Sequence, residues 1–368
     1  MYNIFSSELI VFCYLCALLS NYNAQIKIMQ NIFITGASGF VGQYLVNELI
    51  TKTTNQLFLL VRARKNKSAS QRIKNVFEQH KHLVGSRIIP IEGELDKEYF
   101  GLESEKFEDL AHKINIVYHT AATIKFNLPY KEAYDINVGG TKTCLLLAKK
   151  AGSKFERFHH ISTAYVNRQL KKDEKRAFNN TYEQTKFEAE LLFKETENVP
   201  YTIYRPSIVS GNSVTGKLAA SSIIYKFIIL LSRNLLCKLP VDSDASLNII
   251  PVNNFVNKML AIGSKKESIG KTYHITHQKN TEFRALLEQA CKLLNVEPPE
   301  FVSMQQIEDI PKQIMQHIEV FMPYITQSQK FEFQTEEWNA NILPPCDNVI
   351  STLHHIIYNF SSATNQNS

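Results

Sequence analysis

Tyr182 and Lys186 form the pattern Tyr-x-x-x-Lys in a stretch, residues 182–195, that we predict to be helical. Positions i and i+4 share one face of a helix, so the phenol and the ammonium can reach the same site. Because a nearby ammonium favours the phenolate, we expect Lys186 to lower the pKa of Tyr182 and make it a usable acid or base near neutral pH. The pattern is common, and a surface tyrosine and lysine would be the better interpretation if it stood alone.

Two hydroxyl groups lie upstream of this pair. Ser162 and Thr163 stand at the end of a strand predicted at residues 155–162. Ligands of open parallel sheets bind at the carboxyl ends of the strands, so we expect these hydroxyls at the ligand edge. The chain order of a glycine turn, a hydroxyl, a tyrosine and a lysine favours a catalytic site over a chance pattern.

The glycine turn is residues 35–42, Thr-Gly-Ala-Ser-Gly-Phe-Val-Gly. It follows a short apolar run and opens a helix-like segment, which is the layout that holds a dinucleotide pyrophosphate. Gly36 permits the tight turn, Gly39 lets the backbone approach the phosphates, and Gly42 lets the helix pack on the strand. The helix N-terminus then offers free N–H groups to the anion. An ordinary turn is the alternative.

The residue after the next apolar run indicates which dinucleotide binds. An NAD-binding protein of this type carries an acidic residue about twenty positions after the glycines. This chain has Arg62 there, followed by Arg64, Lys65 and Lys67. A guanidinium can hold a 2′-phosphate through two parallel hydrogen bonds, so we expect NADP(H) with Arg62 as the main contact. A solvated basic loop or a nucleic-acid patch is the alternative.

Strand-like and helix-like segments alternate over the first 210 residues or so. The apolar runs lie at residues 32–34, 57–61, 87–91, 114–119, 155–162 and 201–204. Helical stretches such as residues 141–150 and 182–195 separate them. The alternation predicts an α/β fold, a Rossmann-like doubly wound parallel sheet with helices on both faces. After about residue 211 we expect a smaller, mainly helical C-terminal substrate cap, part of which returns to the sheet.

These patterns divide the chain into segments. We expect residues 29–210 to be the NADP(H)-binding domain, 211–360 the substrate-binding cap and 361–368 a disordered tail. Residues 1–28 contain an apolar run too short to span a bilayer, which needs ~20 residues, and they lack the basic flank of a secretory signal. We interpret them as an extension upstream of a native start at Met29, with a weak membrane anchor as the alternative. The apolar stretch at residues 223–231 is either buried core or a surface for a lipid chain or a membrane.

Composition bears on partners and location. The chain has 368 residues, 44% of them hydrophobic, and a net charge of +6. Because much of the positive charge lies between Arg62 and Arg87, the total does not call for a nucleic-acid partner. The six cysteines and the paired histidines lack the spacing of a metal site. We expect no metal, no disulfide framework and a reducing, cytoplasmic location, with monomer or homodimer left open.

Taken together, these stretches resemble the extended short-chain dehydrogenases/reductases, and within them the thioester-reductase and fatty acyl-CoA reductase branch. Besides the glycine turn and the Tyr-x-x-x-Lys pattern, the resemblance rests on residues 93–95 (Gly-Glu-Leu), 119–126 (His-Thr-Ala-Ala-Thr-Ile-Lys-Phe), 137–141 (Asn-Val-Gly-Gly-Thr), 162–166 (Ser-Thr-Ala-Tyr-Val) and 205–216 (Arg-Pro-Ser-Ile-Val-Ser-Gly-Asn-Ser-Val-Thr-Gly). Glu94 stands where the family usually has an aspartate beside the adenine, and its longer carboxylate can still serve.

The resemblance implies a role for each matching residue. Thr163 positions or polarises the substrate carbonyl, Tyr182 donates the proton, Lys186 tunes it, and Asn137 supports the lysine through a water relay. Ser162 is expected to be structural. The residues implied in cofactor binding are Thr35, Gly36, Ser38, Gly39, Phe40, Val41, Gly42, Arg62, Glu94, Leu95, Ala121, Ala122, Thr123, Tyr182, Lys186, Pro206, Ser207 and Ile208.

The activity that the resemblance implies is NADPH-dependent reduction of an acyl thioester, carried by CoA or a carrier protein, to an aldehyde. A second NADPH could take the aldehyde to the alcohol. An NADP-dependent ketone or alcohol oxidoreductase of the flavonoid-reductase or hydroxysteroid-dehydrogenase type is the alternative. A non-catalytic NADP(H)-sensing protein is a third interpretation, although such proteins typically lose the tyrosine or the lysine, and both are present here.

Overall fold

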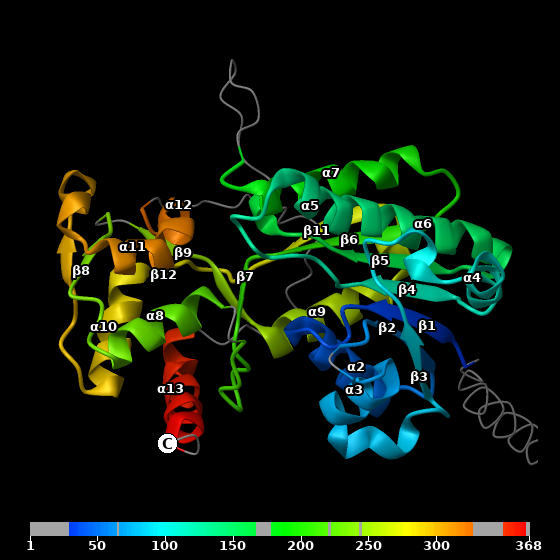
Figure 1. Cartoon of the computed structure of the whole chain (residues 1–368), viewed down its shortest axis with the longest axis horizontal. Coiled ribbons are helices and arrows are strands. Elements are labelled where there is room, and N and C mark those ends of the chain that lie inside the picture. Colours follow the sequence, from blue (N-terminus) through cyan, green and yellow to red (C-terminus); the bar gives the residue numbers. More distant parts are fainter. Residues whose placement is uncertain are drawn as a thin grey trace, which may run out of the picture.

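The structure is a computed structural model that describes residues 29–64, 66–166, 178–219, 222–242, 245–326 and 349–365. These residues form two lobes, a larger one built on a sheet and a smaller, mostly helical one beside it (Figure 1). The expectations for residues 1–28, for Lys65 and for residues 366–368 lie outside the described residues.

A parallel sheet forms the centre of the larger lobe. Its described strands follow the order β11-β6-β5-β4-β1-β2-β3, and each neighbouring pair is parallel. The strands are β1 (Asn31–Thr35), β2 (Gln56–Val61), β3 (Ile88–Glu92), β4 (Ile116–His119), β5 (Arg157–Ile161), β6 (Tyr201–Pro206) and β11 (Lys271–Ile275). The strand order reverses between β1 and β4, which is where doubly wound sheets bind their ligands. The predicted fold class is confirmed.

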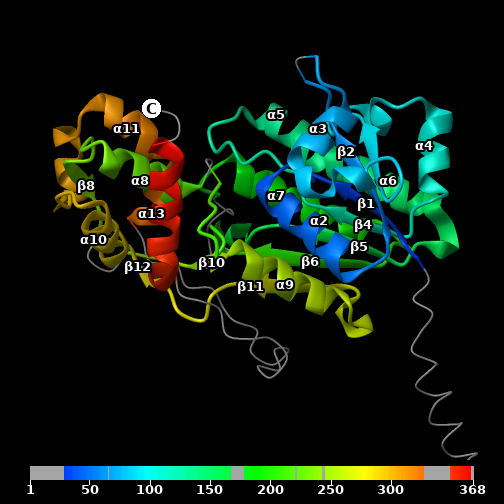
Figure 2. The ribbon, with the colours of Figure 1, turned by 90° about the horizontal axis from the view of Figure 1, so that it is seen from below.

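Helices cover both faces of this sheet. On one face lie α2 (Phe40–Lys52), α3 (Ala69–Val76) and α9 (Val252–Gly263), with α2 and α9 side by side (Figure 2). On the other lie α4 (Ser104–Ala111), α6 (Gly140–Ala151) and α7 (Thr181–Glu195) (Figure 1). Because successive strand residues point to opposite faces, Ile32 and Ile34 join a core with residues of α2 and α9, whereas Phe33 joins a core with residues of α4 and α6.

The smaller lobe surrounds a hydrophobic core of its own. Its helices are α8 (Ile223–Ser232), α10 (Phe283–Leu294), α11 (Lys312–Ile318), α12 (Met322–Ile325) and α13 (Val349–Asn365). Short strand pairs join β8 (Lys238–Pro240) to β13 (Glu300–Val302) and β9 (Ser246–Leu247) to β12 (Thr281–Glu282). A further pair, β7 (Ile208–Ser210) and β10 (Ile249–Pro251), lies between the lobes. The carboxyl ends of the central strands face this lobe (Figure 1).

The apolar stretch at residues 223–231 is buried core. It lies within α8, whose buried side chains Ile223, Ile224, Phe227, Ile228, Leu230 and Leu231 share a cluster with residues of α10 and α13. The cavity that several of them line measures about 10 Å³, room for about one water molecule. The buried-core interpretation of this stretch is therefore confirmed. Within the described ranges, none of the helices has the length and hydrophobicity needed to cross a bilayer.

The C-terminal helix corrects the predicted tail. α13 continues to Asn365, past residue 361, where we expected disorder to begin. Adding a residue to an existing helix costs far less than starting one, so a polar segment without helix-breaking residues extends the turns formed by the apolar residues before it.

Candidate active site

The glycine turn lies between the end of β1 and the start of α2. Gly36 has a φ of +73°, and a Cβ at this position would lie 2.7 Å from the backbone nitrogen of Ala121. A Cβ on Gly42 would lie 2.1 Å from the carbonyl oxygen of Gly36. Gly39 caps α2 without a side-chain hydrogen bond, and the first turn contains no acidic residue. The N–H groups of that turn are therefore available to an anion.

Thr35, one of the residues expected to take part in cofactor binding, has a buried side chain that contacts the end of β4 and the loop after it. Its hydroxyl is buried, lies 2.7 Å from Nδ1 of His119, and accepts a hydrogen bond from the Ala121 N–H at 3.3 Å. These contacts join the end of β1 to the end of β4 and to the loop that follows it, so the Thr35 side chain supports the glycine turn. The other turn residues that we singled out are partly buried around the turn: Ser38, Phe40 and Val41.

Arg62 is exposed just after β2, and the guanidinium groups of Arg64 and Arg72 lie near it. Arg72 on α3 donates a hydrogen bond to the backbone carbonyl of Arg62. Burial lowers the pKa of Arg72, and the charges of Arg64 and Arg62 lower it further. A bound anion would relieve this repulsion. We did not single out Arg72 from the sequence, although its place in the same basic stretch was a signal.

The loops after β3 and β4 carry the next residues that we expected to bind the cofactor. Glu94 is exposed, so a ligand can reach its carboxylate. Leu95 instead packs against the start of α6, where a Cβ on Gly140 would lie 2.4 Å from the Leu95 Cγ. The side chain of Leu95 therefore fixes α6 against the loop after β3. The residues that follow β4 are partly buried: Ala121, Ala122 and Thr123.

Tyr182 and Thr163 meet at the carboxyl end of β5. The side-chain oxygen of Asn180 caps α7 by accepting a hydrogen bond from the Glu183 N–H at 3.0 Å. The Thr181 hydroxyl donates to a backbone carbonyl of the loop after β4 at 2.9 Å, so the turn that carries Tyr182 is held at both of its neighbours. The buried Thr163 side chain lies near enough to the Tyr182 phenol for its hydroxyl to lower the pKa of that phenol. Two hydroxyls that we singled out from the sequence thus lie together.

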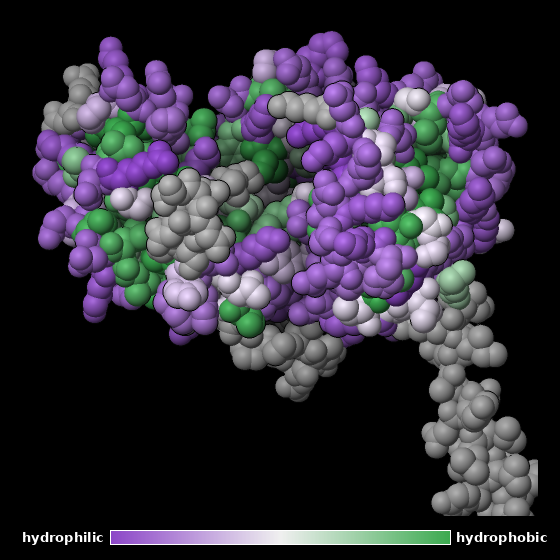
Figure 3. Space-filling model, turned by 60° about the horizontal axis from the view of Figure 1, so that its bottom comes forward, coloured by the Kyte–Doolittle hydropathy of each residue, from purple (hydrophilic) through white to green (hydrophobic). Residues whose placement is uncertain are grey.

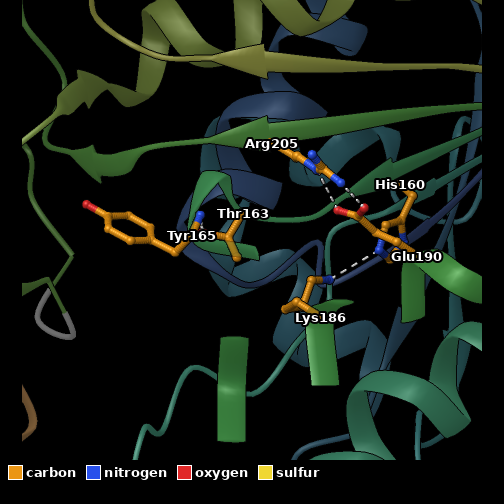
Figure 4. Close-up of polar contacts among 6 residues, drawn as sticks. All are labelled: His160, Thr163, Tyr165, Lys186, Glu190 and Arg205. Carbon is orange, nitrogen blue, oxygen red and sulfur yellow. Dashed lines mark hydrogen bonds and ion pairs between the residues drawn. The ribbon is translucent and has the colours of Figure 1, made fainter. Parts of the chain in front are cut away.

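The pKa of Tyr182 corrects one expectation. Burial raises this pKa to about 12, with an opposing effect of the Thr163 hydrogen bond and a further increase from the Glu183 charge. The Lys186 charge is not among the causes of this shift. The Lys186 ammonium instead lies 3.4 Å from Nε2 of His160 on β5 (Figure 4). A shared helical face brings two side chains close, but a long flexible stem can carry the charge elsewhere. The prediction that Lys186 lowers the pKa of Tyr182 is therefore wrong for this structure.

A buried ion pair lies beside Lys186. Burial lowers the pKa of Lys186 to about 8, and the Glu190 charge opposes this decrease. Glu190 accepts two hydrogen bonds from Arg205, at 3.0 and 2.6 Å (Figure 4). We singled out neither His160 nor this pair. The i, i+4 spacing of Lys186 and Glu190 was the available signal, whereas His160 and Arg205 reach the lysine only through the fold.

The histidine that contacts Lys186 is neutral. His119 and His160 stack with ring centres 5.4 Å apart. Burial and the Lys186 charge hold the pKa of both rings well below the usual range. An ammonium can only donate, so Nε2 of His160 is the acceptor and the ring proton lies on Nδ1, which is buried with no hydrogen-bond partner among the described residues. His160 therefore receives a hydrogen bond from Lys186 without competing for its proton.

Asn137 lies in a π-helical segment, η3 (Asp135–Gly139), that follows α5 (Tyr130–Tyr134). Its amide oxygen accepts from the Thr123 N–H at 2.8 Å, and its amide nitrogen donates to the Thr185 hydroxyl at 2.9 Å. Short π-segments are frequent at functional sites. Asn137 thus joins the loop after β4 to the residue before Lys186, while the water relay to the lysine stays a prediction.

Two unpaired hydroxyls mark the ends of β5 and β6. Ser162 and Ser207 are buried, and their side-chain oxygens have no hydrogen-bond partner among the described residues. Buried hydroxyls usually have one, so a bound molecule with polar groups fits here. Pro206 is buried beside Ser207, and Ile208 is partly buried. Figure 3 shows a surface hollow between the two lobes, with hydrophobic side chains visible in it.

Replacing Lys186 with methionine is expected to stabilise the protein at pH 7 while removing activity. Below pH 8 the lysine is charged in the folded and in the unfolded protein. Burying the charged ammonium therefore destabilises the folded wild-type protein by its full cost. Between about pH 8 and 10.5 the folded protein releases the proton and the unfolded chain keeps it, so wild-type stability rises. Over that range the advantage of the variant should shrink by on the order of 3 kcal/mol.

Denaturant unfolding of the wild type and of Lys186→Met from pH 7 to 10.5 measures the difference between their unfolding free energies. The titration of groups that both proteins share cancels in this difference. Lys194→Met, at an exposed lysine of the same helix, is the matched control and should give a difference that does not change with pH. A constant difference for Lys186→Met as well would show that the lysine is not held at a lowered pKa.

The amino-acid sequence of this chain is similar to those of known proteins. A family model described as "Male sterility protein", an NAD-binding family, matches residues 34–259. A putative fatty acyl-CoA reductase of Drosophila melanogaster is 30% identical over 284 residues, which cover 64% of this chain and 54% of that protein. The chain spans about half the length of the curated fatty acyl-CoA reductases that it matches.

Solved structures share the fold. The terminal R domain from the myxalamid PKS-NRPS biosynthetic pathway superposes with a TM-score of 0.77 at 22% identity, covering 91% of each chain. A UDP-glucuronic acid 4-epimerase from Bacillus cereus superposes with a TM-score of 0.66 at 16% identity, covering 90% of this chain and 99% of that one. Since a reductase domain and an epimerase both share this fold, the fold by itself does not select a reaction.

Proposed function

Because the chain belongs to the male sterility protein family of NAD-binding proteins, we propose that it is an NADPH-dependent reductase that converts an acyl thioester, carried by CoA or by a carrier protein, to an aldehyde. The observation that carries the proposal is that Thr163 and Tyr182 lie at the carboxyl edge of the sheet, where the Thr163 hydroxyl is near enough to lower the pKa of the phenol. The names of the relatives, among them fatty acyl-CoA reductases and an R domain, support a thioester as the substrate.

The residues present fit a nicotinamide dinucleotide. The turn at Gly36 and Gly39 and the uncapped start of α2 would hold the pyrophosphate, because they offer backbone N–H groups where no side chain intervenes. The buried Ser162 and Ser207 hydroxyls would face the nicotinamide end. At the opposite end, the exposed Arg62 would face the adenosine ribose.

Each polar residue then has a task in the reduction. When bound, the cofactor supplies the hydride. Thr163 donates a hydrogen bond to the substrate oxygen as negative charge develops on it, and Tyr182 holds the proton that this oxygen receives. The raised pKa of Tyr182 keeps the phenol protonated near neutral pH, as a donor requires. Lys186, with a pKa of about 8, stays mostly charged and favours negative charge nearby. The hemithioacetal so formed collapses to aldehyde and thiol.

The preference for NADPH over NADH rests on the cluster of Arg62, Arg64 and Arg72. Three positively charged guanidinium groups attract a negatively charged 2′-phosphate, which NADPH has and NADH lacks. Replacing Arg62 with alanine should weaken NADPH binding about 10-fold, since a charge-assisted hydrogen bond contributes roughly 1.5–3 kcal/mol. NADH binding should not change.

Fluorescence titration of both cofactors measures this effect, with Lys154→Ala, an exposed basic residue of η4 (Gly152–Lys154) away from the cluster, as the control. Equal losses for NADPH and NADH would mean that Arg62 does not select the phosphate.

A direct assay tests the proposed activity. Purified protein is mixed with NADPH and acyl-CoA esters from short to long chain, and NADPH loss, free thiol and aldehyde or alcohol are followed together. Thiol release equal to NADPH loss for an aldehyde product, or half of it for an alcohol, supports thioester reduction. The same panel includes an acyl carrier-protein thioester and a simple ketone. Turnover of the ketone with no thiol release from any ester would replace the proposal by ketone reduction.

A further inference from the structure

A contact between the lobes lies directly beside Tyr182. Glu183, the next residue of α7, is fully buried, and its carboxylate accepts a hydrogen bond from the phenol of Tyr324 in α12 at 2.6 Å. The same phenol accepts a hydrogen bond from the side chain of Asn180, the N-cap of α7, at 2.8 Å. One side chain of the smaller lobe therefore holds both the cap and the first turn of the helix that carries Tyr182.

Aromatic rings complete this contact. Phe126, in the loop after β4, lies with its ring centre 5.8 Å from that of Tyr182 and 5.5 Å from that of Tyr324. Phe321 packs edge-on against Phe126 at 5.9 Å, and Tyr165 packs edge-on against Tyr324 at 5.0 Å. Tilted and edge-on pairs are favourable arrangements of aromatic rings. The ring of Tyr182 thus packs against Phe126, and Phe126 in turn packs against Tyr324 of α12.

The Glu183 carboxylate depends on the Tyr324 hydrogen bond. Among the described residues, its other donors are the backbone N–H and the side-chain amide of Asn179, both at 2.9 Å. A buried carboxylate is costly unless it is well hydrogen-bonded, so loss of the phenol would leave Glu183 short of a donor and loosen the first turn of α7. Proton transfer requires close alignment, and a displacement of ~1 Å can cost about 100-fold in rate.

We propose that Tyr324 is a positioning residue, whose hydrogen bond to Glu183 docks the smaller lobe on α7 and aligns the Tyr182 phenol for proton transfer. The rate predictions below rest on the proposed thioester reduction, whereas the docking itself is measurable without substrate. No chemistry is assigned to Tyr324, which acts through Glu183 and the first turn of α7.

Tyr324→Phe keeps the ring and removes the hydrogen bond. We expect kcat to fall about 10-fold, with unchanged KM and NADPH affinity. The solvent deuterium isotope effect on kcat should rise, because a poorly aligned proton transfer becomes slower relative to the other steps. Tyr130→Phe is the matched control: Tyr130 also donates to a glutamate of α7, Glu188 at 2.9 Å, but at an exposed position. It should leave kcat and the isotope effect unchanged.

Wild-type kcat in Tyr324→Phe, or a lower kcat with an unchanged isotope effect, would overturn the proposal. Hydrogen exchange of the cofactor-free protein separates this failure from that of the proposed function. The amides at the start of α7 should exchange faster in Tyr324→Phe than in wild type or in Tyr130→Phe. If the wild-type protein reduces no thioester, this measurement alone decides: equal exchange in all three proteins means that Tyr324 does not dock α7.

Discussion

Tyr182→Phe is expected to lower kcat for thioester reduction by about 100- to 1,000-fold, within the range that positioned acid–base groups contribute. The phenylalanine ring can still pack against Phe126, whose ring centre lies 5.8 Å from that of Tyr182. The change therefore removes the proton donor and leaves the surrounding packing. The Thr163 hydroxyl can still hydrogen-bond the developing oxyanion, but it is a far weaker acid than a phenol and cannot replace the donor.

Initial rates of thiol release and NADPH loss measure this effect, and fluorescence titration shows whether NADPH still binds with wild-type affinity. Tyr130→Phe again serves as the control, because it removes a tyrosine hydroxyl at an exposed position. A variant that keeps kcat close to wild type would show that another group donates the proton. A parallel loss of NADPH affinity would assign Tyr182 to cofactor binding instead.

Gly42→Ala is expected to abolish high-affinity NADPH binding, with a loss of roughly 100-fold or more. A Cβ at this position would lie 2.1 Å from the Gly36 carbonyl oxygen, a backbone atom that cannot rotate away. The turn and α2 must then separate, which removes backbone donors from the pyrophosphate. Each hydrogen bond to a charged group contributes roughly 1.5–3 kcal/mol, so losing two of them accounts for the expected decrease.

Titration with NADPH and thermal unfolding without cofactor measure the two consequences, binding and packing. Gly39→Ala should have a milder effect on thermal unfolding, since its Cβ would lie 3.1 Å from the same oxygen, but it should also weaken NADPH binding, because Gly39 lets the backbone approach the phosphates. Gly139→Ala is the control, because its Cβ would meet no atom closer than 3.9 Å. Wild-type NADPH affinity in Gly42→Ala would contradict the assignment of this turn to the pyrophosphate.

The features that could be predicted from the sequence depend on neighbours along the chain. The glycine turn, the alternation of strands and helices, and the helical spacing of Tyr182 and Lys186 are set by backbone geometry over a few residues. Thr163 could be placed at the ligand edge because strand ends of a parallel sheet meet there. The resemblance then supplied the roles, and the family match to residues 34–259 agrees with it.

The features that could not be predicted depend on which distant segments pack together. The direction of the Lys186 side chain follows from His160 on β5, and the Glu183 carboxylate is satisfied by Tyr324, a residue 141 positions away. The pKa of Tyr182 is raised mainly because the fold buries the phenol, and the charge of the neighbouring Glu183 raises it further.

The sequence by itself therefore determined the fold class, because this follows from local periodicity, and together with the family resemblance it predicted the nucleotide-binding turn and the reacting groups. Only the tertiary structure decided which partners those groups have and what their pKa values are. Burial and hydrogen bonding depend on side chains that long-range packing brings together, and no spacing along the chain specifies that packing.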